Sequence, residues 1–150
     1  MKIIVDTNIV FSALLNSTGR IGNLLLYPKN HFEFYSCKYL QKEIFRHLPK
    51  IQKYTKLHQD DLFELMNLLE SRIFFVDEDL LPTKTVVEAK KLVCDVDFDD
   101  LFFVALTNHL NGLLWTGDKE LIEGLKRKGY QSIVTTLDLS IVLDKLKKNE

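Results

Sequence analysis

Residues 2–8 of the chain read KIIVDTN, and this short stretch decides the interpretation of the fold. Its apolar, β-branched run ends at Asp6, as expected for a strand that is buried on both faces of a sheet. Thr7 or Asn8 can then cap a helix, because their side chains accept hydrogen bonds from a first helical turn. That helix would bury an apolar stripe formed by Ile9, Val10, Ala13 and Leu14.

Further along the chain, the spacing of apolar residues keeps switching between a strand-like and a helix-like period. Further strands are predicted at Phe32–Tyr35, Ile73–Val76, Leu113–Thr116 and Ser132–Thr135. Further helices are predicted at Ile21–Leu26 (ending near Pro28), Cys37–Leu48 (ending at Pro49), 58–70, from a capping box at Thr85–Glu88 towards Val93, Phe98–His109, Lys119–Lys128 and Leu139–Leu146. Alternating strands and helices imply right-handed crossovers. We therefore predict a single domain over residues 1–150, an α/β three-layer sandwich with a central, mostly parallel sheet.

Length and composition agree with one globular domain. The chain has 150 residues, of which 46% are hydrophobic and 27% charged, so wholesale disorder is excluded. The net charge of −1 gives no general sign of a nucleic-acid or membrane binder. The charge is nevertheless polarised. Residues 37–58 hold six Lys and Arg against one acid, whereas residues 77–100 hold eight acids against three lysines.

Cysteine usage and the N-terminal segment indicate where the protein acts. Cys37 and Cys94 match no metal or redox spacing, and two such thiols fit a reducing compartment. The first apolar run is interrupted by Asp6 and Asn8, so it fits neither a signal peptide nor a membrane span. We expect a cytoplasmic protein without membrane attachment.

Acidic side chains gather where a parallel sheet binds ligands. Such ligands bind outside the carboxyl ends of the strands, and Asp6 and Asp118 each follow a predicted strand. Three acids within residues 97–100 crowd the start of a predicted helix, and Glu43 lies within another. Gathered carboxylates repel one another, and a divalent cation removes that cost. Because their oxygens are hard ligands, the pattern favours Mg²⁺ or Mn²⁺.

Most of these acids also have a purely structural interpretation. Asp97 and Asp118 can each cap the helix that follows. Glu43 can pair with Arg46 or His47 one helical turn away. The residues alone leave both interpretations open. Only the acid that ends the first, buried strand clearly needs a charged partner, because its desolvation is otherwise uncompensated.

Three segments resemble the motifs of PIN-domain ribonucleases, in particular the toxins of bacterial toxin–antitoxin pairs. Residues 3–10 (IIVDTNIV) match the family's first motif, residues 97–106 (DFDDLFFVAL) resemble its third acidic segment, and residues 113–121 (LLWTGDKEL) resemble the fourth. The segments occur in the family's order and span nearly the whole chain. The resemblance implies a PIN-like fold and metal-dependent cleavage of RNA.

The resemblance also implies roles for particular residues. The metal-binding and catalytic acids would be Asp6, Glu43, Asp100 and Asp118, and the polar supports would be Asn8 and Thr116. Asp97 or Asp99 are alternatives to Asp100, which is preferred because the apolar helix of the third segment follows it directly. Asp97 would then be an outer ligand or bind a second ion.

The implied reaction is hydrolysis of RNA phosphodiester bonds with Mg²⁺ or Mn²⁺ as cofactor. Three basic residues of one predicted helix would contact the RNA backbone, namely Lys38, Lys42 and Arg46. Such a charge run is as often a solvated helix face. Phe11, Tyr39 and Tyr54 can stack on bases, although such residues more often belong to the core. The resemblance further implies an antitoxin protein as partner and a homodimer.

Two other classes of protein remain as alternatives. A catalytically silent PIN fold would bind RNA or another protein, and the complete set of acids argues against it. A phosphoacceptor receiver domain is also a doubly wound sheet with strand-end aspartates. It needs a paired acid beside Asp6 and a Lys at the end of the strand Ser132–Thr135, and the sequence has neither.

Overall fold

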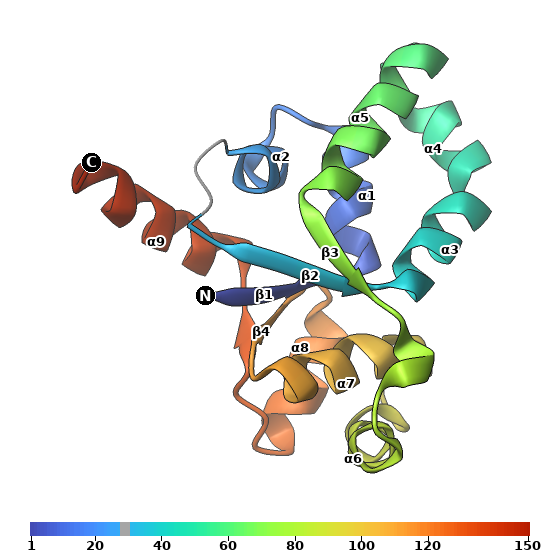
Figure 1. Cartoon of the computed structure of the whole chain (residues 1–150), viewed down its shortest axis with the longest axis vertical. Helices are drawn as coiled ribbons and strands as arrows, with labels where there is room; N and C mark the ends of the chain where they lie inside the picture. The colour runs from blue at the N-terminus through green and yellow to red at the C-terminus, as the bar shows by residue number, and fades with distance from the viewer. Residues whose placement is uncertain (28–30) are drawn as a thin grey trace.

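A computed structural model describes residues 1–27 and 31–150 and contains one central sheet (Figure 1). In these residues the sheet has five parallel strands in the order β3-β2-β1-β4-β5. The strands are β1 (Lys2–Val5), β2 (Glu33–Cys37), β3 (Ile73–Val76), β4 (Leu113–Trp115) and β5 (Ile133–Val134). The predicted α/β class is confirmed, and the sheet is parallel throughout.

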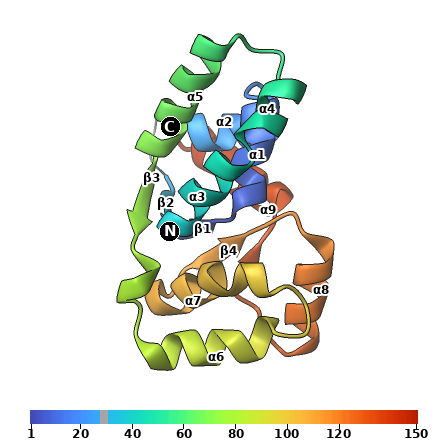
Figure 2. The ribbon, with the colours of Figure 1, turned by 90° about the vertical axis from the view of Figure 1, so that its right-hand side faces the viewer.

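Helices cover both faces of the sheet and complete the three layers. The α-helices are α1 (Thr7–Leu15), α2 (Arg20–Leu26), α3 (Lys38–Arg46), α4 (Leu48–Tyr54), α5 (Gln59–Ser71), α6 (Thr83–Val93), α7 (Leu101–Leu110), α8 (Lys119–Arg127) and α9 (Thr136–Lys148). Short 3₁₀ turns occupy Glu78–Leu80 and Phe98–Asp100. Helices α1 to α5 lie on one side of the sheet and α6 to α8 on the other, while α9 packs against α2 (Figures 1 and 2).

The order of the strands creates a crevice beside β1. From β1 the chain builds outwards to β2 and β3 with its helices on one face, then returns to β4 and β5 with its helices on the other. The connections therefore diverge between β1 and β4. In doubly wound sheets this switch point, at the carboxyl ends of the strands, is where ligands bind.

Strand β1 is buried on both faces of the sheet, as the sequence predicts. Ile3, Ile4 and Val5 are completely buried, because β2 and β4 flank the strand and helices cover both faces. The hydroxyl of Ser36 in β2 donates to the carbonyl oxygen of Val5 at 2.7 Å. Trp115 is buried beside Val5 and belongs to the core, where its indole N–H donates to Thr136. These contacts fix the end of β1 just before Asp6.

The structure corrects several predicted boundaries. The helix expected over Cys37–Leu48 is two helices, because Pro49 lies in the first turn of α4, where its missing N–H costs nothing. Strand β2 continues to Cys37 rather than ending at Tyr35. The capping box expected at Thr85 is wrong, since α6 begins two residues earlier with Pro82 as its N-cap and no side-chain cap. The expected stop near Pro28 lies outside the described residues.

The described residues contain no single helix that is long and apolar enough to cross a membrane. Only α1 and α2, bent by 106° relative to each other, meet that test when they are taken as a pair.

Candidate metal centre

An acidic pocket of about 200 Å³ lies at the carboxyl ends of β1 and β4, at the switch point of the sheet. It is lined by Asp6, Thr7, Asn8, Glu43, Asp97, Asp99, Asp100, Phe103 and Asp118. All six acids singled out in the sequence therefore line one hollow, although they come from four separate segments of the chain. We refer to this hollow as the acidic pocket.

Asp6 is the most buried of these acids, with 2% of its surface exposed. Its Oδ1 accepts from the backbone N–H of Ile9 at 3.0 Å, so Asp6 itself is the N-cap of α1. The prediction that Thr7 or Asn8 caps this helix is wrong. Burial raises the pKa of Asp6 to about 6, against the effect of a hydrogen bond from Thr116, and the charge of Asp118 adds to the rise.

Asp118 reaches the pocket from the end of β4. Its Oδ1 accepts from the backbone N–H of Leu121 at 3.2 Å, which makes it the N-cap of α8, as predicted. Its own backbone N–H donates to the buried hydroxyl of Thr116 at 3.1 Å. Thr116 therefore contacts both strand-end acids, whereas Asn8 lies exposed at the rim of the pocket.

The 3₁₀ turn between α6 and α7 supplies three acids. Asp97 accepts from the N–H of Asp99 at 3.0 Å and caps this turn, so its predicted capping role is confirmed for the 3₁₀ turn that precedes α7. Carboxylate oxygens of Asp97, Asp100 and Asp118 all lie within 4.8 Å of one another. Asp99 lines the same pocket but is exposed.

Asp100 is the acid with the least internal support. Among the described residues, 1–27 and 31–150, its Oδ2 is the buried side-chain oxygen or nitrogen that has no hydrogen-bond partner. Burial raises the pKa of Asp100 to about 8, and the charges of Asp97, Asp6, Asp118 and Glu43 act in the same direction. The ionised form of Asp100 is therefore disfavoured both by burial and by the acids around it.

Glu43 enters the pocket from α3. Its Oε1 accepts from the hydroxyl of Thr7 in α1 at 2.6 Å, a contact between helices that exists beside the electrostatic interaction with Arg46 and His47. Burial raises the pKa of Glu43, and the hydrogen bond from Thr7 and the charges of His47 and Arg46 oppose that rise. Thr7 is a site residue that sequence reasoning missed as a side-chain partner.

The donor set of the acidic pocket fits a divalent cation. All of its charged groups are carboxylates, and hard oxygen ligands are those that Mg²⁺ and Mn²⁺ prefer. The free Oδ2 of Asp100 lacks a partner that a cation would supply. A bound cation would also remove the repulsion that raises the pKa of Asp100.

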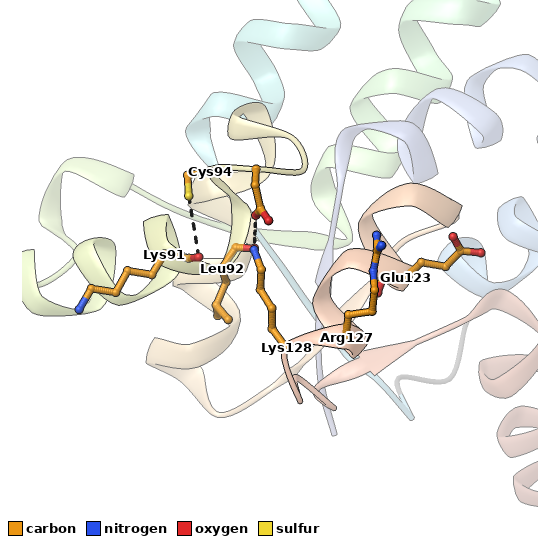
Figure 3. Close-up of polar contacts among 7 residues, drawn as sticks. Lys91, Leu92, Cys94, Glu123, Arg127 and Lys128 are labelled. Atoms are coloured by element: carbon orange, nitrogen blue, oxygen red, sulfur yellow. Dashed lines mark hydrogen bonds and ion pairs between the residues drawn. The ribbon is translucent and has the colours of Figure 1, made fainter.

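A lysine at the end of α8 contacts the segment that leads into the 3₁₀ turn Phe98–Asp100 (Figure 3). The ammonium group of Lys128 donates to the backbone oxygen of Leu92 at 2.8 Å and to the carboxylate of Asp95. The hydrogen bond between Lys128 and Asp95 lowers the pKa of Asp95, which lies two residues before Asp97. Sequence analysis missed this contact, because a separation of 33 residues carries no local signal.

The three basic residues expected to contact RNA lie on α3 and are exposed. The ammonium group of Lys38 lies 3.6 Å from Asp77, so this lysine already has an acidic partner. Arg46 hydrogen-bonds to Tyr39, and its charge acts on Glu43 at the edge of the acidic pocket. Basic groups therefore flank the acids on the α3 side.

Comparison with known proteins places this architecture in a family. A family model described as PIN domain matches residues 4–138. Curated protein sequences gave no significant match. Among solved structures, a chain of VapBC2 from Rickettsia felis, bound to a DNA fragment from their promoter, is similar with 15% identity and a TM-score of 0.62, covering 90% of this chain and 97% of that chain. This likeness concerns the fold, whereas the family model spans most of the sequence. The chain belongs to the PIN domain family.

Proposed function

We propose that the protein is a divalent-metal-dependent endoribonuclease and the toxin of a toxin–antitoxin pair. The observation that carries the proposal is the buried, unpartnered Oδ2 of Asp100 among the carboxylates of the acidic pocket. If these acids had only a structural role, we would expect a hydrogen-bond donor at the Oδ2 of Asp100. In a metal site this oxygen stays free to bind the cation.

Each acid has a distinct task in this proposal. Asp6, Asp100 and Asp118 are direct or water-mediated ligands, and Glu43 and Asp97 are additional ligands. When bound, Mg²⁺ or Mn²⁺ supplies Lewis-acid activation of water and of the scissile phosphate. Two supports keep the ligands in place, namely Thr116 for the strand-end acids and Thr7 for Glu43.

Basic residues beside the pocket would bring the RNA backbone to it. Lys42 and Arg46 are exposed on α3 and are available for phosphate contacts. Lys38 would have to leave Asp77 to take part. The choice of RNA over DNA comes from the family resemblance.

An antitoxin protein is the proposed partner. The similar solved chain belongs to VapBC2, which was crystallised on promoter DNA. By analogy, a cognate protein would bind this chain and block the acidic pocket, and a second copy of the chain would form a homodimer with it.

The proposal is tested by cleavage of end-labelled single-stranded RNAs in Mn²⁺, Mg²⁺ or EDTA. The variant is Asp6→Asn, which keeps an N-cap of equal quality and removes one charge from the pocket. The matched control is Asp144→Asn, an exposed acid on α9. Metal uptake is measured in parallel by isothermal titration with Mn²⁺.

We expect cleavage that requires metal, is lost in Asp6→Asn and is unchanged in Asp144→Asn. Undiminished cleavage by Asp6→Asn would refute the assignment of the site. A folded wild type that takes up Mn²⁺ but cuts none of the RNAs would instead indicate a silent PIN fold that binds RNA or another protein.

A further inference from the structure

A second hollow adjoins the acidic pocket. It has a volume of about 390 Å³ and is lined by residues of α1, α3 and α4. These helices lie side by side in Figure 2. Thr7, Asn8 and Glu43 line both hollows, so the second one leads directly away from the acids. Its volume falls in the range of sites for small organic ligands. We refer to it as the side groove.

Aromatic side chains form the walls of the side groove. Phe11 of α1 faces His47, with the two rings edge to face and their centroids 5.6 Å apart. Tyr54, at the end of α4, also lines the groove and is 60% exposed. Ile51, completely buried, supports this wall from below. Flat, accessible rings of this kind are what an unpaired base stacks on.

Amino groups lie beside the rings of the side groove. Lys50 lines the groove, and the ammonium group of Lys53 lies 5.5 Å from the ring centroid of Tyr54. On α1 the lining extends from Thr7 to Leu15, a span of about 12 Å at the rise of an α-helix. The groove thus combines aromatic rings and amines next to the acids of the acidic pocket.

This combination matches the chemistry of a nucleotide chain, which alternates phosphates with bases. A cation at the acidic pocket would hold one phosphate, the rings would take the neighbouring base, and the amines would meet the next phosphate. An apolar peptide segment would use the rings but would have no use for the paired lysines. The charge pattern therefore favours a nucleotide as occupant.

We propose that the side groove binds one unpaired nucleotide of an RNA strand, next to the phosphate held at the acidic pocket, with its base stacked on Tyr54 and a neighbouring phosphate beside Lys50. This inference rests on the proposed nuclease function. It makes the substrate single-stranded at this position, because a base within a duplex cannot enter a groove between two helices.

The test measures binding of a fluorescein-labelled single-stranded hexaribonucleotide to the full chain by anisotropy in Ca²⁺. Each position of the RNA is replaced in turn by an abasic residue. The variants are Tyr54→Ala and Tyr54→Phe, and the matched control is Phe45→Ala, a ring on α3 that is 77% exposed and lies outside the groove. Lys50→Ala is compared with Lys145→Ala, an exposed lysine of α9.

We expect Tyr54→Ala to weaken binding by roughly 5- to 150-fold, the range of one stacked base. Tyr54→Phe should restore most of it, because the ring is kept. One abasic position should weaken the wild type by a similar factor and have no further effect in Tyr54→Ala, since both changes remove the same contact. Lys50→Ala should reduce the salt dependence of binding, and neither control should change it.

Two results would overturn the inference while the nuclease function stands. In the first, the wild type binds and cleaves RNA, but Tyr54→Ala behaves like the Phe45→Ala control. In the second, the losses from Tyr54→Ala and from every abasic position simply add up. Either result would leave the groove to another occupant, such as a segment of a protein partner. A wild type that takes up Mn²⁺ but neither binds nor cuts RNA would overturn both proposals.

Discussion

Asp100→Asn should stabilise the metal-free protein and abolish the stabilising effect of metal, two opposite results from one substitution. The pKa of Asp100 rises from 3.8 to about 8, first through burial and then through the charges of neighbouring acids. A carboxylate with a raised pKa contributes its full stability only below the unfolded pKa and loses it as the pH rises through the folded pKa. At pH 8 the folded wild type therefore bears a cost that a neutral amide avoids.

The size of this effect follows from the same shift. A tenfold change in proton affinity corresponds to about 1.4 kcal/mol. The rise of the pKa from 3.8 to about 8 therefore limits the gain in the free energy of unfolding of Asp100→Asn over the wild type to roughly 6 kcal/mol. Solvent in the open pocket screens the charges and reduces the expected gain to roughly 2–3 kcal/mol. For a chain of this length, that gain raises the Tm by roughly 5–10 °C.

The assay is thermal unfolding followed by circular dichroism, in EDTA and in excess MgCl₂, at pH 8 and at a pH near 4. In EDTA, Asp100→Asn should exceed the wild type at pH 8 and match it near pH 4, where the wild-type carboxyl is protonated when folded. Mg²⁺ should raise the Tm of the wild type and of the Asp144→Asn control, but not of Asp100→Asn. An Asp100→Asn variant that is less stable than the wild type at pH 8, or that gains as much from Mg²⁺, would refute the reasoning.

Three further predictions concern the surroundings of Asp100. The metal-free wild type should lose stability steadily from about pH 4 to pH 8 in urea unfolding, because the raised pKa values of Asp6 and Asp100 mean that the folded state holds protons that the unfolded state has released. Thr116→Val should lower the free energy of unfolding by about 1–3 kcal/mol and weaken Mn²⁺ binding in isothermal titration, because a buried hydroxyl that contacts both strand-end acids is lost. Lys128→Met should speed hydrogen–deuterium exchange in residues 94–100 with little change in Tm, since it removes a surface contact to the backbone of Leu92.

The sheet could be predicted from the sequence because its strands carry their own signal. Apolar, β-branched runs such as Ile3–Val5 have no stable place outside a doubly covered sheet, and the helical periods between them require crossovers. The residues at which helices and strands begin and end could be predicted less well. Pro49 ends helices when it follows them and starts helices when it lies in their first turn, and only packing around Ile51 decides between the two.

Asp6 and Asp118 could be predicted for the same topological reason, since strand ends meet at one edge of a parallel sheet, whereas Glu43 and Asp100 were assigned through the family resemblance. Their partners could not. The hydrogen bond between Thr7 and Glu43 joins α1 to α3 across 36 residues and depends on how those helices pack. Within residues 97–100 the choice among three acids depends on a 3₁₀ turn. Asp97 and Asp99 are both exposed and Asp100 is half-buried, but it is Asp97 and Asp100 whose carboxylate oxygens lie within 4.8 Å of an oxygen of Asp118.

The capping and metal-binding interpretations of Asp118 exclude each other only if a carboxylate is treated as a single group. Its Oδ1 accepts from the N–H of Leu121, and its second oxygen remains for a cation. Two substitutions separate the roles. Asp118→Asn keeps an N-cap of equal quality and relieves the repulsion that Asp118 exerts on Asp6 and Asp100, so in EDTA it should be at least as stable as the wild type while losing Mn²⁺ affinity and cleavage. Asp118→Ala should lose the same functions and have a free energy of unfolding about 0.5–2 kcal/mol below that of Asp118→Asn. Equal Mn²⁺ affinity in the wild type and Asp118→Asn would show that this acid is a cap alone.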